Sequence, residues 1–295
     1  MPELPEVETI ARGLAKRVTG DVIESVWLGE KKEPLKSPAI EIARTLEHSR
    51  IARVHRMGKH IVFDLARNGV GRAGVRTKSA RSRAKREASA PKQGGVGRAQ
   101  WIVHLGMTGR LQVCEPQVEI QKHTHAVLKL ESGRELRFVD PRRFGRLSVA
   151  QADFSATGIE PLEIDLERFI GLFRGRKTPI KSALLNQKLL RGVGNIYADE
   201  SLFRAGVRPR RRAANVSRDE FQKLHAGLKE VLTEAIALGG SSVSDYVDAD
   251  GAEGFFQLQH RVYGREGEPC LVCKTPIKRV VIAGRSSHYC PKCQK

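Results

Sequence analysis

The chain has 295 residues, with 52 Lys and Arg against 33 Asp and Glu, and a formal net charge of +19 at pH 7. This length can bury one large or two modest cores, and the basic surplus points to a polyanion, above all nucleic acid. The chain has no apolar run of 18 residues, no amphipathic basic helix with exposed aromatics and no signal peptide. We therefore expect a soluble, cytoplasmic protein without a membrane partner.

The chain begins Met1-Pro2-Glu3-Leu4-Pro5-Glu6, so removal of Met1 would leave proline as the first residue. A terminal proline is a secondary amine that can attack an aldehyde-like carbon and form an iminium. Glu3 and Glu6 stand beside that amine and could move protons. The alternative is an ordinary helix start with proline and acidic residues in its first turn, because apolar residues then recur at helical spacing. Removal of Met1 stays an open question at this point.

The rest of the N-terminal half predicts antiparallel sheets, packed as a sandwich. Short β-branched stretches, often alternating, predict strands at residues 22–28, 51–54, 60–65, 101–105, 124–130 and 135–139. Residues 68–100 interrupt this pattern with Gly, Ala, Ser and nine Lys or Arg against one Glu. Such a composition buries too little apolar surface to order itself, which predicts a disordered basic insert between two strands.

Helical patterns replace the strands after about residue 150, and residues 151–163 have the character of a linker. Helices are predicted from Leu166 to Phe173, at 182–190 and at 195–204, the last two around a glycine-containing turn at 191–194.

A capping box, Ser217 with Glu220, opens a long helix that Gly239 and Gly240 end. A polar loop at 241–254 then leads to a predicted strand at 255–263.

Two Cys-x2-Cys pairs near the C-terminus predict a zinc site. Their members are Cys270, Cys273, Cys290 and Cys293, with sixteen residues between the pairs. Four thiolates complete a tetrahedral site without an open position, so one Zn²⁺ would be structural and would brace a small basic hairpin. Disulfides or a redox pair are the alternative. Cys114 is left over and is expected to be a small core residue.

Two glycine-bounded segments could present side chains to nucleic acid. They are His104-Leu-Gly-Met-Thr-Gly109 and Asp140-Pro-Arg-Arg-Phe-Gly145. An apolar side chain such as Met107 or Phe144 can wedge into a base stack, and Arg142 can fill the space of a displaced base. The alternative is that Met107 and Phe144 pack in the sandwich core.

These segments, in this order, resemble the bacterial formamidopyrimidine-DNA glycosylase family. The resemblance rests on Pro2-Glu-Leu-Pro-Glu-Val-Glu8, Gly58-Lys59, the two glycine-bounded segments, Gly192-Val-Gly-Asn-Ile-Tyr-Ala198, Val262-Tyr-Gly-Arg265 and the four cysteines. It covers nearly the whole chain except residues 68–100. It implies a bifunctional glycosylase and lyase that removes 8-oxoguanine and formamidopyrimidines from double-stranded DNA.

The resemblance also assigns roles to individual residues. Pro2 would form the Schiff base, Glu3 would transfer protons with support from Glu6, and Lys59 and Arg285 would assist the β- and δ-eliminations that nick the strand. On the residues alone, Lys59 could equally be a solvated surface lysine. The DNA contacts implied by the resemblance are Met107, His123, Arg142, Phe144, Lys177, Lys181 and Asn195.

The implied architecture is an α+β multidomain protein. A catalytic β-sandwich flanked by helices spans 1–150, the linker spans 151–163, a helix-two-turn-helix domain with a lesion-capping loop (241–254) spans 164–254, and a zinc-finger hairpin spans 255–295. We expect a monomer associated with the bacterial nucleoid.

Two alternatives to this function stay open. One is the sister endonuclease VIII group, which prefers oxidised pyrimidines and lacks the Met/Arg/Phe trio. The other is a DNA-binding relative that has lost its chemistry, against which the intact Pro2, Glu3 and Lys59 speak.

Overall fold

The computed structural model describes residues 2–31, 33–67, 98–151, 153–242 and 251–295. Its N-terminal part contains two antiparallel sheets of four strands each. The first has the order β1 (Ile23–Leu28), β6 (Thr124–Leu130), β7 (Glu135–Val139), β5 (Arg110–Cys114). The second has the order β2 (Ser49–Met57), β3 (His60–Arg67), β4 (Arg98–His104), β8 (Arg146–Ala150).

One hydrophobic core joins these sheets. It takes Phe63 and Trp101 from one sheet and Leu128 and Phe138 from the other, and all four side chains are buried. Helix α1 (Leu4–Val18) adds its apolar face to the same core, as its helical spacing predicted. The predicted antiparallel sandwich with a flanking helix is therefore confirmed.

Three elements of this part were not predicted. They are α2 (Ala39–Leu46), β5 and β8. Each is only five or eight residues long, so its periodicity was too short to stand out.

The predicted insert at 68–100 begins after β3. Residues 68–97 lie outside the described residues. Arg98, Ala99 and Gln100 belong to β4, where they pair with Ala66, Leu65 and Asp64 of β3, so the end of the prediction was three residues too late.

The C-terminal part is mainly helical. Its elements are α3 (Leu166–Phe173), α4 (Ile180–Leu184), α5 (Asn195–Ala205), η1 (Ala213–Asn215), α6 (Arg218–Ala237) and η2 (Phe256–Gln259). They share a second core that includes Phe169, Phe173 and Phe221. The predicted capping box is confirmed, because the Ser217 and Glu220 side chains each accept a hydrogen bond from the other residue's N–H.

The helix predicted at 182–190 was placed too late. Helix α4 spans Ile180–Leu184, and the side chain of Asn186 then accepts a hydrogen bond from the N–H of Lys188 at 3.0 Å. An Asn side chain that accepts a hydrogen bond from a backbone N–H two residues later competes with helix continuation, which explains the early end.

The strand predicted at 255–263 is wrong. Residues Phe256–Gln259 form the short 3-10 helix η2, and Phe256 is buried. The N–H groups of Arg261, Val262 and Tyr263 donate to the carboxylate of Glu200 instead of to a neighbouring strand.

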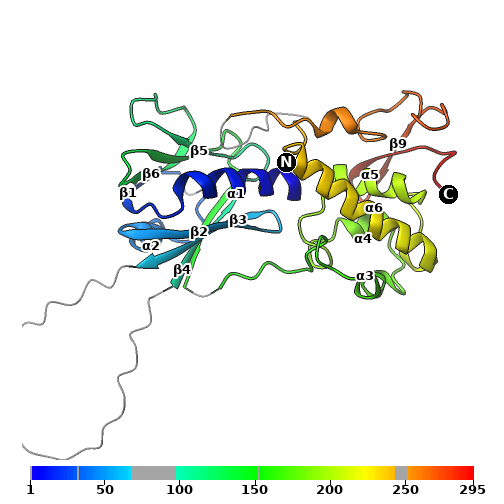
Figure 1. Cartoon of the computed structure of the whole chain (residues 1–295), viewed down its shortest axis with the longest axis horizontal. Helices are drawn as coiled ribbons and strands as arrows, with labels where there is room; N and C mark the ends of the chain where they lie inside the picture. Colours follow the sequence, from blue (N-terminus) through cyan, green and yellow to red (C-terminus); the bar gives the residue numbers. More distant parts are fainter. Residues whose placement is uncertain (1, 32, 68–97, 152, 243–250) are drawn as a thin grey trace, which may run out of the picture.

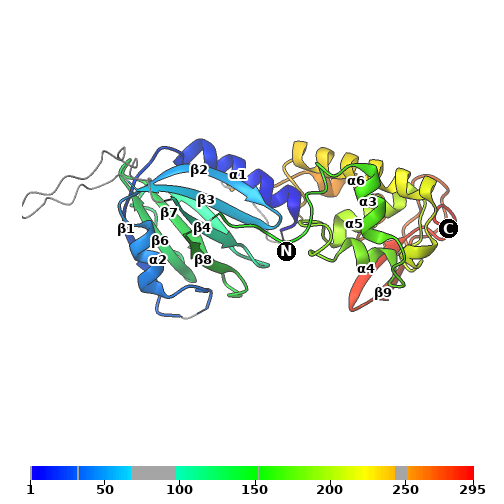
Figure 2. The same ribbon diagram turned by 90° about the horizontal axis from the view of Figure 1, so that it is seen from below.

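A two-stranded hairpin, β9 (Lys278–Ile282) and β10 (Arg285–Tyr289), completes the described chain. Figures 1 and 2 show the strand-rich and helix-rich parts side by side, with the beginning of α1 at their junction. Helix α1 contacts both β2 and α6, so the N-terminus is positioned by both parts.

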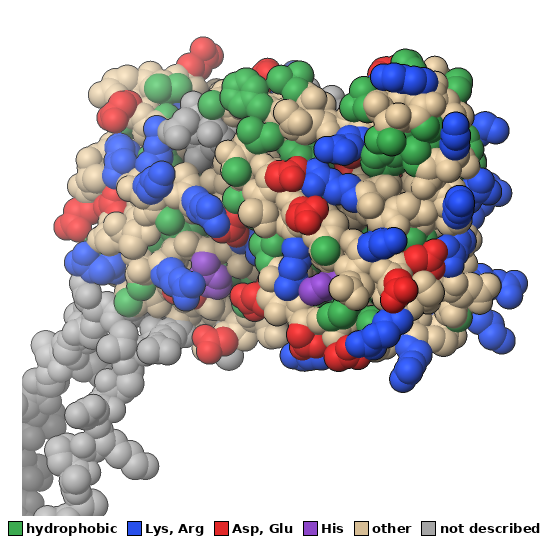
Figure 3. Space-filling view, turned by 45° about the vertical axis from the view of Figure 1, so that its right-hand side comes forward, with side chains coloured by type: hydrophobic (Ala, Val, Ile, Leu, Met, Phe, Trp, Pro, Cys, Tyr) green, Lys and Arg blue, Asp and Glu red, His purple; other side chains and the backbone are tan. Residues whose placement is uncertain are grey.

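Part of the basic surplus lies on the surface of the described residues. Figure 3 shows Lys and Arg side chains along the right-hand margin of the face in view. None of the helices in the described ranges is long and apolar enough to cross a membrane.

Candidate active site

The N-terminal segment lies against the helical part of the molecule. The N–H of Leu4 donates to the carbonyl oxygen of Gly192 at 3.0 Å, so residues 2–4 run beside the turn that precedes α5. Pro2, Glu3 and Leu4 are all buried there. Residues 2–4 are therefore part of the interior of the protein.

Glu3 is buried against the first turn of α5. Its Oε1 atom accepts a hydrogen bond from the N–H of Ile196 at 3.2 Å. Its Oε2 atom is buried and has no hydrogen-bond partner among the described residues. A Cβ atom at Gly194 would lie 2.1 Å from the Glu3 carboxyl carbon, so glycine is needed to leave room for this side chain.

Glu6 connects three segments through one carboxylate. Its Oε2 atom accepts a hydrogen bond from the N–H of Glu3 at 2.8 Å. Its Oε1 atom accepts from the N–H of Ser241 at 2.8 Å and from the hydroxyl of Tyr197. Glu6 therefore fixes the N-terminal segment against α5 and against the segment that follows α6.

Lys59 is the second residue of the two-residue turn between β2 and β3. Gly58, the first residue, has a φ of 61°, a left-handed conformation that this kind of hairpin turn requires at its first position. The turn presents Lys59 at the end of the sheet that faces the N-terminal segment.

A cavity of 540 Å³ brings these groups together. Pro2, Glu3, Glu6 and Lys59 line it from the N-terminal part. Asn195 and its neighbours line it from the helical part, and Arg285 lines it from the hairpin. Residues from the two ends of the chain thus share one cavity.

The electrostatics of the cavity favour proton exchange near neutral pH. Burial raises the pKa of Glu3 to about 7, although the positive charge of Lys59 opposes the shift. Burial lowers the pKa of Lys59, and the nearby charge of Arg285 lowers it further, while Glu3 and Glu6 oppose this. Groups whose pKa values approach the working pH are efficient acids and bases.

The predicted wedge side chains are exposed. Met107 is 40% exposed and Phe144 is 52% exposed, so the alternative that they pack in the core is wrong. The Arg142 guanidinium lies 5.0 Å from the centre of the Phe144 ring. The strand register places all three at the sheet end that holds Lys59, because His104, at the end of β4, pairs with His60 and Arg146.

The other predicted DNA contacts differ in position. His123 is exposed, and its carbonyl oxygen accepts a hydrogen bond from the N–H of Asp140, next to the Arg142 segment. Asn195 begins α5, lines the cavity and has a buried Oδ1 atom without a partner among the described residues. Lys177 is exposed on the segment before α4 and is not among the residues that line the cavity.

Lys181 does not fit its predicted phosphate contact. Its side chain is 1% exposed, and its Nζ atom lies 2.7 Å from Oδ1 of Asp199 and donates to the carbonyl oxygen of Ser286 at 2.6 Å. A buried lysine whose charge is already paired cannot reach a phosphate on the surface. Lys181 instead links α4 to α5 through Asp199 and to β10 through Ser286, the residue that follows Arg285.

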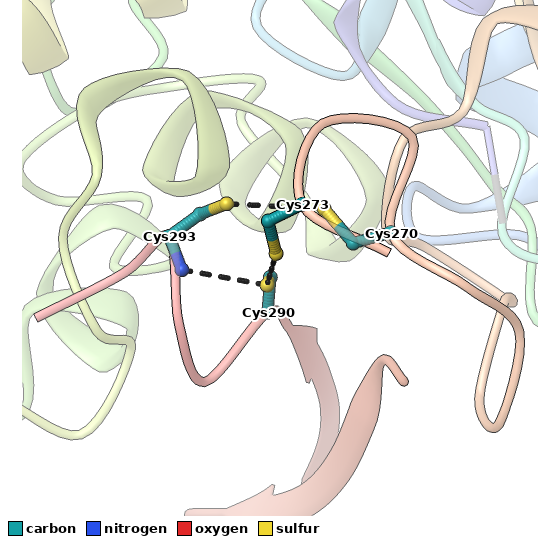
Figure 4. Close-up of side chains that lie close together, drawn as sticks. All are labelled: Cys270, Cys273, Cys290 and Cys293. Carbon is teal, nitrogen blue, oxygen red and sulfur yellow. Dashed lines mark hydrogen bonds between the residues drawn. The ribbon is translucent and has the colours of Figure 1, made fainter. Parts of the chain in front are cut away.

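The four predicted zinc ligands converge. Figure 4 shows the sulfur atoms of Cys270, Cys273, Cys290 and Cys293 turned toward one another, and all four lie within 4.8 Å. The two sulfur pairs at 3.4 and 3.9 Å bracket the separation of about 3.8 Å that a tetrahedral site with Zn–S bonds of about 2.3 Å requires. The donors therefore fit one structural Zn²⁺ and leave no open position. Cys114 is half-buried and far along the chain from this cluster.

Several lining residues were not assigned from the sequence. His104, Ser241 and Tyr263 also line the cavity, and burial lowers the pKa of His104 to about 4. His104 and Tyr263 belong to two of the segments on which the resemblance rests, so their motifs were the available signal. Tyr197 also belongs to such a segment, Gly192–Ala198, but its role was not assigned because its hydroxyl donates to the carboxylate of Glu6 rather than facing the cavity.

Comparisons with known proteins identify the family to which the chain belongs. Models for the formamidopyrimidine-DNA glycosylase N-terminal domain, its H2TH domain and a zinc finger found in FPG and IleRS match residues 1–147, 158–247 and 267–295. A formamidopyrimidine-DNA glycosylase from Solibacter usitatus is 44% identical, with 100% of both chains covered. The crystal structure of the MutM (FPG) protein from Thermus thermophilus aligns at a TM-score of 0.80 and 39% identity, covering 99% of this chain and 98% of that one. A Lactococcus lactis FPG mutant in complex with Fapy-dG containing DNA aligns at a TM-score of 0.83 and 29% identity, with both chains fully covered.

Proposed function

Because the chain belongs to the formamidopyrimidine-DNA glycosylase family, and is thus a DNA glycosylase and lyase for oxidised purines, we propose that Pro2 is its nucleophile. Damaged DNA is its partner. The observation that supports the proposal is the single cavity in which Pro2, Glu3, Glu6 and Lys59 meet. A secondary amine, two buried carboxyl groups and a lysine are the groups that Schiff-base chemistry on a sugar needs.

In the first step, the unprotonated amine of Pro2 bonds to C1′ of the damaged nucleotide. The glycosidic bond breaks, and the base leaves with a proton. Glu3 moves protons at this stage, since its pKa of about 7 lets it both donate and accept. Its unpartnered Oε2 atom is the atom available for this transfer.

The amine of Pro2 then loses its proton, and the C1′–O4′ bond breaks as O4′ takes up a proton, which opens the sugar ring and leaves an iminium between Pro2 and C1′. In the second step, this iminium acts as an electron sink. The C2′ proton becomes acidic, Lys59 assists its removal, and the 3′ phosphate leaves by β-elimination. Arg285 holds phosphate and helps the 5′ phosphate leave by δ-elimination. The lowered pKa of Lys59 supports its role as a base at neutral pH.

The remaining residues hold the DNA. Met107, Arg142 and Phe144 fill the space of the displaced nucleotide, and the exposure of both apolar side chains supports this. Asn195 stands at the N-terminus of α5, where N–H groups and the helix dipole favour a phosphate. His123 and Lys177 make further contacts, whereas Lys181 positions the hairpin.

The loop at 241–254 caps the oxidised purine in this proposal. Its beginning is anchored by the hydrogen bond from the N–H of Ser241 to Glu6. Residues 243–250 lie outside the described residues. The protein acts as a monomer on the bacterial nucleoid, in the cytoplasm and without a membrane.

Duplexes that each carry one lesion test this function. The wild-type protein should excise 8-oxoguanine faster than an oxidised pyrimidine and leave a nicked strand with phosphate at both ends. Glu3→Gln should still bind the 8-oxoguanine duplex but lose excision by about 10²–10⁴-fold, because only proton transfer is removed. Faster excision of the pyrimidine would favour an endonuclease VIII-type preference, and full activity of Glu3→Gln would refute the role of Glu3.

A further inference from the structure

The two segments that present the wedge side chains meet at one buried carboxylate. Met107 lies between β4 and β5, and Arg142 and Phe144 lie between β7 and β8. Asp140, at the start of the second segment, is fully buried (0% exposed). Its Oδ1 atom accepts a hydrogen bond from the hydroxyl of Thr108 at 2.6 Å, and its Oδ2 atom accepts from the N–H of Gly145 at 2.7 Å.

The hydroxyl of Thr108 also reaches the backbone of the second segment. It accepts a hydrogen bond from the N–H of Arg142 at 3.3 Å, and the same N–H lies 3.3 Å from Oδ1 of Asp140. Thr108 directly follows Met107 in the chain. One hydroxyl therefore connects the residue next to the methionine with the backbone that carries the arginine.

The two segments are also in direct backbone contact. A Cβ atom at Gly106 would lie 2.5 Å from both the Gly145 nitrogen and the Phe144 carbonyl carbon. Neither segment can move toward the other, and the Asp140 hydrogen bonds keep them from moving apart. Gly106 and Thr108 flank Met107, so both of its neighbours are fixed.

A third segment, which contains His123 and His125, holds the backbone of Asp140. The N–H of Asp140 donates to the carbonyl oxygen of His123 at 3.0 Å, and a ring nitrogen of His125 lies 3.0 Å from the carbonyl oxygen of Asp140. Asp140 is thus held at its backbone as well as at its side chain, and it forms the meeting point of three segments.

We propose that Thr108 and Asp140 are positioning residues that hold Met107, Arg142 and Phe144 as one rigid unit for entry into the DNA helix. The inference rests on the proposed function, in which these three side chains fill the space of the displaced nucleotide. Unstacking a base costs free energy, and segments that had to become ordered on binding would add an entropic cost. Because the hydrogen bonds around Asp140 already order the two segments in the free protein, this entropic cost does not arise on DNA binding.

Matched threonine variants test the proposal. Thr108→Val keeps the shape of the side chain but removes the hydroxyl, whereas Thr108→Ser keeps the hydroxyl. Thr45→Val is the control, because Thr45 is a buried threonine on α2, away from these segments. Each variant is assayed under single-turnover conditions on an 8-oxoguanine duplex and on a duplex that already holds an abasic site, and its thermal unfolding is recorded.

We expect Thr108→Val to excise 8-oxoguanine at least 10-fold more slowly and to nick the abasic duplex within 2-fold of the wild type, because no base has to leave the stack there. Thr108→Ser and Thr45→Val should match the wild type on both duplexes. In a Met107→Ala background the effect of Thr108→Val should shrink, since both changes act on the same step.

Equal losses on the two duplexes, or an unchanged rate on 8-oxoguanine, would overturn the inference. So would a Thr108→Val effect that is undiminished in the Met107→Ala background. A wild-type protein that fails to excise 8-oxoguanine at all would instead contradict the proposed function, so the two failures are distinguishable.

Discussion

At the scale of single residues, the burial of Glu3 favours activity but opposes folding stability at neutral pH. Its pKa rises from 4.5 to about 7 on folding, because the folded protein buries the carboxyl group. Between these two values the folded state holds more protons at Glu3 than the unfolded state does. The contribution of Glu3 to folding stability therefore falls as pH rises from 4.5 to 7, and the loss is complete above pH 7.

This reasoning predicts that Glu3→Gln is more stable than the wild type at alkaline pH. A shift of this size corresponds to about 3 kcal/mol of unfolding free energy. Urea unfolding of both proteins at pH 4.5, 6 and 8 should show an advantage of the variant that grows with pH toward that value. A constant difference across these pH values would show that Glu3 does not change its proton binding on folding.

Gly194 makes a second prediction at this scale. Gly194→Ala would place a Cβ atom 2.1 Å from the Glu3 carboxyl carbon, so the carboxyl group must move and excision should fall by at least 10-fold. Gly171→Ala is the matched control, because a Cβ atom there meets nothing within 4 Å. The control should keep full excision and gain up to about 1 kcal/mol of stability in α3. Equal excision by the two variants would contradict the role given to the Glu3 position.

At the scale of elements, the zinc hairpin depends on its metal more than the helices do. Among the described residues, its core consists of Phe203, Val262, Cys270, Ile277 and Cys290, with Cys273 and Cys293 packed against them, whereas the helical core that includes Phe169 and Phe221 contains none of the cysteines. A core this small rarely folds without a metal or disulfide.

Removal of zinc by a chelator should therefore abolish DNA binding and nicking while most of the helical circular dichroism signal remains. Added Zn²⁺ should restore both activities. DNA affinity that is unchanged in zinc-free protein, measured by fluorescence anisotropy, would show that the hairpin needs no metal to hold Arg285 in the cavity.

Elements also show what the sequence could and could not predict. Long periodic segments such as α1 and α6, and local motifs such as the Ser217 capping box and the paired cysteines, were predicted because their causes are local. The strand predicted at 255–263 failed because a distant residue, Glu200, binds its N–H groups. Lys181 was misassigned for the same reason, since only the folded chain brings Asp199 and Ser286 to its side chain.

At the scale of the whole molecule, a buried ionic network joins the strand-rich and helix-rich parts. Arg56 of β2 donates two hydrogen bonds to Glu160, at 2.8 and 3.0 Å, and one to Glu8 of α1 at 2.8 Å. Arg191, next to the turn before α5, donates to Glu160 at 3.3 Å. Because the cavity takes residues from both parts, this network helps to fix the distance between Lys59 and Asn195.

Glu160→Gln should therefore cost about 3 kcal/mol of unfolding free energy, since Arg56 is then left with the Glu8 carboxylate alone and Arg191 loses the charge of Glu160. It should also slow excision, because the distance between the two sides of the cavity is then no longer fixed by this network. The control is Glu167→Gln, whose partner Arg218 is exposed, and it should change neither the Tm nor the rate. Similar effects of the two variants would mean that the network has no special role.

The central claim is that the amine of Pro2 attacks the damaged nucleotide, and borohydride trapping tests it most directly. The mass of the intact protein is first measured by mass spectrometry to establish that Met1 has been removed. It is then incubated with an 8-oxoguanine duplex and borohydride, and the trapped complex is digested with trypsin. We predict a covalent adduct on the N-terminal peptide that ends at Arg12. An adduct on a peptide that contains Lys59, or no adduct from protein that nicks the duplex, would contradict the claim.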